Sequence, residues 1–105
     1  MAKRISGEEF ETLVLQAEKP VLVDFYSDTC MPCKMVAGIL GDIEDEYEEK
    51  IDIYKVNVNY EETLTEQYNV MAAPTLIVFW QGEEHARTKG AAKKDAILGL
   101  FADII

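Results

Sequence analysis

The sequence predicts an α/β protein whose sheet is covered by helices on both faces. Three segments, 21–27, 51–59 and 75–80, are strongly apolar and rich in β-branched and aromatic residues, as strands covered on both faces are. Segments with apolar residues at helical spacing alternate with these strands. Such alternation predicts a parallel sheet, and a glycine-containing turn after the third strand adds an antiparallel hairpin. We therefore expect a mixed sheet between two layers of helices.

The chain begins with a candidate short strand at 2–6 and a helix. Ser6 and Glu9 have the spacing of a capping box, which marks the start of a helix. The helix is expected to end at Lys19 and Pro20, because proline cannot continue it. Its apolar positions recur at helical spacing: Phe10, Leu13, Val14 and Ala17.

Three further elements complete the predicted order. The helix after the first long strand buries the apolar positions Val36, Ile39, Leu40, Ile43 and Tyr47. Asn59 and Glu62 repeat the capping spacing before a short helix that ends near Tyr68. The segment 84–89 is polar enough for an edge strand, and an amphipathic helix over 93–104 closes the chain.

Length and charge narrow the class of protein. The 105 residues fit one domain, residues 1–105. The net charge of -10 opposes binding to nucleic acid or anionic membranes. No apolar run approaches the roughly 18 residues of a membrane span, and the N-terminal segment has no apolar signal-peptide core. We expect a cytoplasmic monomer.

The only two cysteines, Cys30 and Cys33, stand between a predicted strand and a predicted helix. At a helix N-terminus, backbone N–H groups and the helix dipole favour a thiolate, which is the reactive form of cysteine. Cys33 is one turn further along and can close a disulfide with Cys30. Pro32 suits the first helical turn, where a missing N–H costs little. The context indicates a redox pair.

Asp24 lies inside the apolar strand before the cysteines. Burial disfavours the charged form of a carboxyl group, so this residue is a candidate for proton transfer near neutral pH. A structural hydrogen bond, or a side chain that reaches solvent, explains the same position equally well from the residues alone.

Over nearly its full length the chain resembles thioredoxins. The matching segments are "VLVDFYSDTCMPCKMVAGIL", "KVNV", "APTLIVFWQGE" and "TKGAAKKDAI". The resemblance implies the thioredoxin fold, with a central mixed sheet of four to five strands flanked by helices on both faces. It also implies reduction of disulfides in protein substrates by dithiol exchange, with no bound cofactor. Electrons would come from a flavoprotein of the thioredoxin reductase type.

The same resemblance implies roles for residues outside the cysteine motif. Asp24 corresponds to a buried carboxylate that accepts a proton during catalysis, and Lys55 to its charged partner. Pro74 corresponds to a cis-proline beside the cysteines, which leaves the backbone of Ala73 to pair with an extended substrate. Gly90 corresponds to a glycine that lets the substrate chain come close. For Lys55 and Gly90, a surface amine and an ordinary turn are the alternatives.

The chain departs from the thioredoxin pattern on its contact surface. Thr29 stands where tryptophan is usual, Met31 where glycine is usual, and Gly38 where the active-site helix usually has proline. Lys89, directly before Gly90, stands where an apolar residue is usual. We expect Thr29, Met31 and Pro32 to contact substrates and the altered surface to change the choice of partner. Of the methionines, Met31 is expected to be exposed and Met35 to lie in the core.

Two other classes of function are weighed against a redox enzyme. A metal-binding module would use the cysteine pair as ligands, but a structural zinc site needs four ligands and His85 is the only histidine. We expect His85 to be a solvated edge-strand residue and expect no metal site. A binding-only adaptor would not require both cysteines, Asp24 and Pro74 together.

Overall fold

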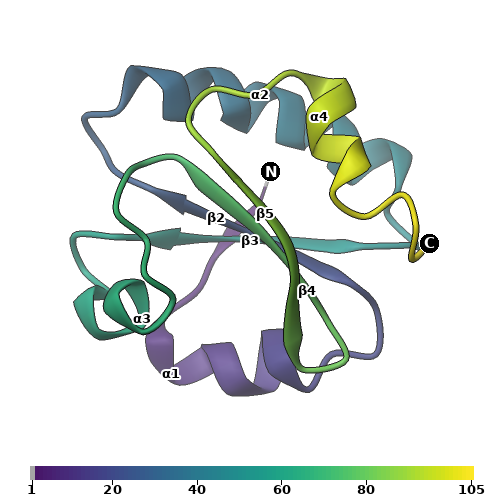
Figure 1. The fold of residues 1–105 in the computed structure, drawn as a ribbon, viewed down its shortest axis with the longest axis horizontal. Coiled ribbons are helices and arrows are strands. Elements are labelled where there is room, and N and C mark those ends of the chain that lie inside the picture. The colour runs from purple at the N-terminus through teal and green to yellow at the C-terminus, as the bar shows by residue number, and fades with distance from the viewer. Residues whose placement is uncertain (1) are drawn as a thin grey trace.

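The computed structural model describes residues 2–105 and contains a five-stranded mixed sheet (Figure 1). The strand order is β1-β3-β2-β4-β5. Neighbours among the first three strands are parallel, whereas β4 is antiparallel to β2 and β5 is antiparallel to β4. The bounds are β1 Lys3–Arg4, β2 Val21–Tyr26, β3 Asp52–Asn57, β4 Thr75–Trp80 and β5 Glu83–Lys89. This confirms the predicted mixed sheet, including the short first strand and the polar edge strand.

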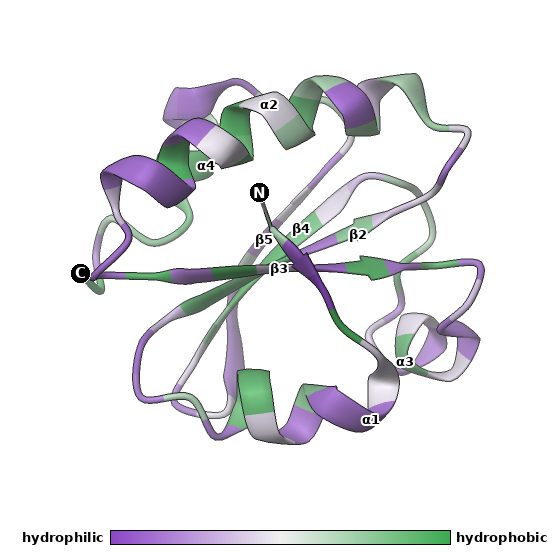
Figure 2. Ribbon diagram, turned by 180° about the vertical axis from the view of Figure 1, so that it is seen from behind, coloured by the Kyte–Doolittle hydropathy of each residue, from purple (hydrophilic) through white to green (hydrophobic). Residues whose placement is uncertain are grey.

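Helices cover both faces of the sheet, as predicted. In Figure 1, α2 and α4 lie above the sheet and α1 and α3 lie below it. Figure 2 shows the same two layers from behind, coloured by hydropathy. The bounds are α1 Gly7–Phe10, the π-helical continuation η1 Glu11–Leu15, α2 Met31–Glu46, α3 Glu62–Gln67 and α4 Lys94–Gly99.

Alternation of side chains along β2 divides the core into two parts. Val21, Val23 and Phe25 pack in the cluster that contains residues of α1, η1 and α3. Leu22 packs in the cluster that contains residues of α2 and α4. Because successive strand residues point to opposite faces, Asp24 shares the face of Leu22 and lies under α2.

The ends of three helices differ from their predicted positions. The capping box of Ser6 and Glu9 is present, but the helix ends at Leu15 in a π turn rather than at Lys19. The second predicted capping pair is wrong: α3 begins after Glu61 and has no side-chain cap, because Asn57 accepts the Asn59 N–H and delays the helix.

The closing helix is also shorter than predicted. α4 ends at Gly99, and Leu100, Phe101 and Ile104 donate backbone hydrogen bonds three residues back, as in tighter turns. Ile97 and Phe101 are nevertheless fully buried, as expected of the apolar side of the predicted amphipathic helix over 93–104.

Topology places one set of segment ends together at one end of the sheet. β2 and β3 end there in parallel, with Asp24 opposite Lys55. β4 begins there, because Thr75 pairs with Phe25, and β5 ends there, because Lys89 pairs with Thr75. α2 starts from the same end, on the left in Figure 1. None of the helices formed by residues 2–105 is long and apolar enough to cross a membrane.

Candidate functional site

The cysteine pair lies at the N-terminus of α2. Cys30 is the N-cap residue with an extended backbone, and it forms a disulfide with Cys33, whose Cα is 5.2 Å from its own. The backbone N–H of Cys33 points to the Cys30 sulfur at 3.1 Å. Cys30 is half-buried, whereas Cys33 is only 5% exposed. After reduction, this N–H and the helix dipole would stabilise a thiolate on Cys30. Pro32 occupies the first turn, as predicted.

The loop before β4 lies directly beside Cys30. The Ala73–Pro74 peptide bond is cis, and the Ala73 carbonyl oxygen is 3.4 Å from the Cys30 sulfur. Gly90 donates its backbone N–H to the Pro74 carbonyl oxygen at 2.8 Å. The φ of Gly90 is +82°, a backbone conformation that glycine adopts readily and other residues rarely do. Three segments that are distant in sequence therefore meet at Cys30.

Asp24 is buried in β2 with 3% of its surface exposed. Its Oδ1 atom has no hydrogen-bond partner among residues 2–105. Burial raises the pKa of Asp24 to about 7, and the positive charge of Lys55 opposes part of this rise. A carboxyl group with this pKa can accept or release a proton at neutral pH.

Asp24 and Cys33 line the same surface hollow. Its volume is about 200 Å³, which is room for several water molecules at roughly 30 Å³ each. Water in this hollow can carry a proton between the Cys33 sulfur and the Asp24 carboxyl group. The hollow is lined by Asp24, Tyr26, Ser27, Asp28, Cys33, Lys34, Ala37 and Lys55.

Lys55 is half-buried rather than enclosed in the sheet. Its Nζ lies 5.2 Å from the centroid of the Tyr26 ring, over the face of the ring. This cation–π contact holds the charge beside the hollow, where it favours the ionised form of Asp24. The expected pairing of Lys55 with Asp24 is thus electrostatic, across neighbouring strands, and the residue is also partly in contact with solvent.

Two polar residues near the site were missed by the sequence analysis. Asn57 is fully buried at the end of β3 and donates from Nδ2 to Oδ1 of Asp28 at 3.2 Å. This bond ties the loop before Cys30 to the neighbouring strand. The sequence does contain a signal for Asn57: it is a polar residue at the carboxyl end of β3, the parallel neighbour of β2. The carboxyl ends of parallel strands meet at one edge of the sheet.

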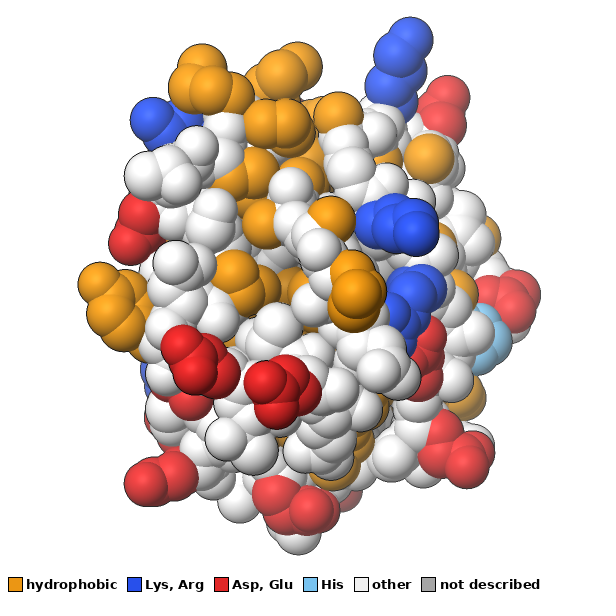
Figure 3. Space-filling view, turned by 60° about the vertical axis from the view of Figure 1, so that its left-hand side comes forward, with side chains coloured by type: hydrophobic (Ala, Val, Ile, Leu, Met, Phe, Trp, Pro, Cys, Tyr) orange, Lys and Arg blue, Asp and Glu red, His pale blue; other side chains and the backbone are white. Residues whose placement is uncertain are grey.

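Several exposed side chains around the disulfide are apolar. Thr29 and Pro32 are exposed, as is Met31, at 69%. Met71, in the loop before the cis-proline, is 90% exposed. The prediction that Met35 is in the core is wrong, because α2 buries Cys33, Val36 and Leu40 and leaves Met35 69% exposed on another side. Figure 3 turns this end of the molecule towards the viewer and shows apolar side chains gathered on it.

The single histidine is away from the cysteines. His85 on β5 lies 3.0 Å from the Asp103 carboxylate in the C-terminal turn, and hydrogen bonding to His85 lowers the pKa of Asp103. Among residues 2–105, no three His, Cys, Asp or Glu side chains are grouped so that they could hold a metal ion.

A dithiol that opens and closes at the start of a helix, next to a backbone edge that can hold a peptide, is the working part of a thiol-disulfide oxidoreductase. Comparison with known families agrees, since the thioredoxin family model matches residues 1–103. The chain belongs to the thioredoxin family. Members of this family reduce a disulfide in a protein substrate while their own pair of thiols is oxidised to a disulfide. In this chain the two thiols are those of Cys30 and Cys33.

Curated relatives match almost the whole chain. A thioredoxin of Acidithiobacillus ferridurans is 42% identical over 99 residues, which is 94% of this chain and 91% of that protein. Thioredoxin C-2 of Corynebacterium nephridii is 41% identical over 98 residues, 93% of this chain and 90% of that protein. Thioredoxin 1 of a Nostoc species is 35% identical over 96 residues, 91% and 90% of the two chains.

Proposed function

We propose that this chain is a cytoplasmic reductant of protein disulfides in which Cys30 attacks the substrate and Cys33 resolves the intermediate. The observation that supports this order is the unequal environment of the two sulfurs. Cys30 is half-buried at the helix N-cap, with the Cys33 N–H at 3.1 Å. Cys33 is nearly buried and borders the hollow that contains Asp24.

In the first step, the Cys30 thiolate attacks one sulfur of the substrate disulfide. A bond forms between Cys30 and that sulfur, the substrate S–S bond breaks, and the departing thiolate takes a proton from solvent. In the second step, the Cys33 thiol loses its proton and attacks the Cys30 sulfur. The mixed disulfide breaks, the second substrate sulfur leaves as a thiolate that takes a proton from solvent, and the Cys30–Cys33 disulfide remains.

Asp24 accepts the proton of Cys33 in the second step, through water in the hollow that both residues line. A pKa of about 7 allows the carboxyl group to be ionised before the transfer and protonated after it. Lys55 assists by stabilising the ionised form, which keeps the acceptor from being neutral throughout the physiological range.

The substrate binds as an extended segment beside Cys30. The Ala73 N–H has no partner among residues 2–105, so it can pair with a substrate carbonyl group, a form of β-augmentation. Pro74 and Gly90 form the floor of this binding surface. Thr29, Met31 and Pro32 contact the substrate from the side of α2.

We further propose that electrons reach the disulfide from a flavoprotein reductase of the thioredoxin reductase type. The chain acts as a monomer and a single domain, without a bound cofactor or metal. Its dithiol carries the electrons itself, because the oxidised pair is the product of each turnover. The cytoplasm keeps thiols reduced, which is the setting in which such a reductant operates.

Trapping the mixed disulfide tests the proposal. The Cys33→Ser variant can attack substrates but cannot resolve the intermediate, so it should accumulate protein adducts in cell extract that dithiothreitol releases. The Cys30→Ser variant is the matched control and should accumulate few adducts. More adducts on Cys30→Ser than on Cys33→Ser, or none on either, would contradict the proposed order.

A further inference from the structure

Acidic residues are absent from three segments around the disulfide. The chain has 20 Asp and Glu residues, yet none lies in 29–41, 67–82 or 85–94. The same segments contain half of the ten basic residues: Lys34, Arg87, Lys89, Lys93 and Lys94. Within a chain of net charge -10, these three segments therefore carry basic side chains and no carboxylates.

The fold brings these three segments together. The Cys30 sulfur is 3.4 Å from the Ala73 carbonyl oxygen, which joins the first segment to the second. The Gly90 N–H bonds the Pro74 carbonyl oxygen at 2.8 Å, which joins the second to the third. Figure 3 shows basic side chains beside the apolar surface of this end and acidic side chains mostly further down the molecule.

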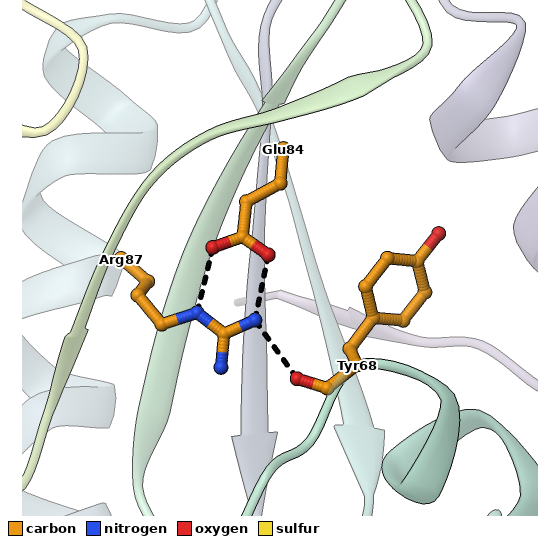
Figure 4. A network of polar contacts seen from close by, with 3 residues as sticks. All are labelled: Tyr68, Glu84 and Arg87. Atoms are coloured by element: carbon orange, nitrogen blue, oxygen red, sulfur yellow. Dashed lines mark hydrogen bonds and ion pairs between the residues drawn. The ribbon is translucent and has the colours of Figure 1, made fainter.

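Two of these five cations are already engaged by carboxylates. Arg87 donates to Glu84 through Nε and Nη2, both at 2.6 Å, and also to the Tyr68 carbonyl oxygen at 2.8 Å (Figure 4). Lys94 lies 2.7 Å from the carboxylate of Glu46. Lys89 has no carboxylate partner among residues 2–105 and is exposed.

Lys89 borders a hollow next to the cis-proline loop. Its strand position pairs with Thr75, the residue that follows Pro74. The hollow has a volume of about 350 Å³, and no carboxylate lines it. Its wall is fixed in part by Arg87, which bonds the Tyr68 carbonyl oxygen at the start of the loop that carries Met71. The lining residues are Asn69, Met71, Thr75, Arg87, Thr88 and Lys89.

We propose that Lys89 makes this chain prefer protein substrates with Asp or Glu near the reacting cysteine, on the segment that lies along β5. The inference rests on the proposed function, since it concerns the substrate held beside Cys30. An acidic side chain in the hollow would meet a cation without a competing carboxylate, while Met71 offers apolar contact. The net charge of -10 alone would repel acidic substrates. A measured preference for acidic substrates would therefore reflect the local effect of Lys89 and not the net charge.

Single-turnover reduction of matched peptides tests the proposal. Two disulfide peptides differ only in two residues next to one cysteine, which are Asp in one peptide and Asn in the other. The pre-reduced chain is mixed with each, and the rate of thiol release is measured without any reductase. At low salt the Asp peptide should react about threefold to fivefold faster, the effect of one exposed ion pair. High salt should remove the difference.

Two neutral variants locate the effect. Lys89→Gln should bring the ratio of the two rates to one or below. Lys50→Gln makes the same change in net charge in the exposed turn after α2, at the other end of the molecule, and should leave the ratio as it is. An Asp-to-Asn ratio of one or less in the unmodified chain, or a ratio that Lys89→Gln does not lower, would overturn the inference alone. Reduction of neither peptide would overturn the proposed function as well.

Discussion

Asp24 is the residue whose environment departs furthest from ordinary solution chemistry. Its carboxyl group is 3% exposed in β2, and its pKa is raised to about 7 by burial. If it accepts the proton of Cys33, Asp24→Asn should slow resolution of the mixed disulfide more than its formation. Quenched-flow measurement of the mixed disulfide separates the two rates. Equal slowing of both steps would count against the role, because formation depends on Cys30.

The same substitution should change how stability depends on pH. The folded-state pKa of about 7 lies above the ordinary value of 3.8, so the folded chain holds a proton that the unfolded chain releases between these values. Unmodified protein therefore loses stability as pH rises from 3.8 to about 7. Asp24→Asn removes this loss, so the free energy of unfolding should rise by up to about 4 kcal/mol at alkaline pH. This figure follows from the pKa difference at about 1.36 kcal/mol per pKa unit.

Denaturant unfolding at several pH values checks this expectation. The gain from Asp24→Asn should fade as the pH falls towards 3.8, where Asp24 is protonated in both states. A gain that stays constant across this range would mean that packing, and not ionisation, causes it.

Single site residues could be predicted from the sequence where the reaction requires a particular type of side chain. The cysteine spacing, and an acid within an apolar strand, marked Cys30, Cys33 and Asp24 as candidates. The bond from Asn57 to Asp28 could not be predicted, since it joins side chains from different segments and depends on the relative placement of β2 and β3. Met35 was placed in the core because methionine is apolar, although its position on α2 faces solvent.

At the scale of elements, apolar periodicity predicted every long strand and helix, since burial determines both the pattern and the packing. Helix ends were less predictable, because they depend on which backbone hydrogen bond forms. Gln16 bonds back five residues to Glu11, and Leu100 bonds back three to Ile97. These alternatives differ little in energy and leave no distinct sequence pattern.

The middle of α2 offers a test of element stability. Gly38 is exposed, and a Cβ built there meets nothing within 4 Å. Glycine inside a helix costs up to about 1 kcal/mol relative to alanine. Gly38→Ala should therefore raise the melting temperature by about 4–8 °C per kcal/mol gained, without loss of reductase activity.

Gly82→Ala is the matched control for this change. Gly82 has φ of +83°, a backbone conformation that alanine rarely adopts, so alanine should destabilise the fold. Thermal unfolding followed by circular dichroism measures both. A lower melting temperature for Gly38→Ala would show that α2 requires glycine at this place.

At the scale of the whole molecule, function depends on segments that only the topology brings together. Cys30, Pro74 and Gly90 are distant in sequence but meet at one end of the sheet. Local patterns contain no information about this meeting, which is why the resemblance to thioredoxins was needed to predict it. The same topology places Lys89, in a chain of net charge -10, beside a hollow that no carboxylate lines, which the sequence alone does not show.

The sole tryptophan tests the direction of β4 across the whole molecule. β4 begins beside the cis-proline and ends at Trp80, and its register pairs Thr75 with Phe25 and Phe79 with Val21. At about 3.4 Å per residue, Trp80 is roughly 17 Å along the strand from the active-site end. A disulfide quenches indole fluorescence only at close range. Trp80 emission should therefore be nearly the same in the oxidised and the dithiothreitol-reduced chain, while thiol titration confirms full reduction. A several-fold change with the fold intact would contradict the placement of Trp80 at the far end of the sheet.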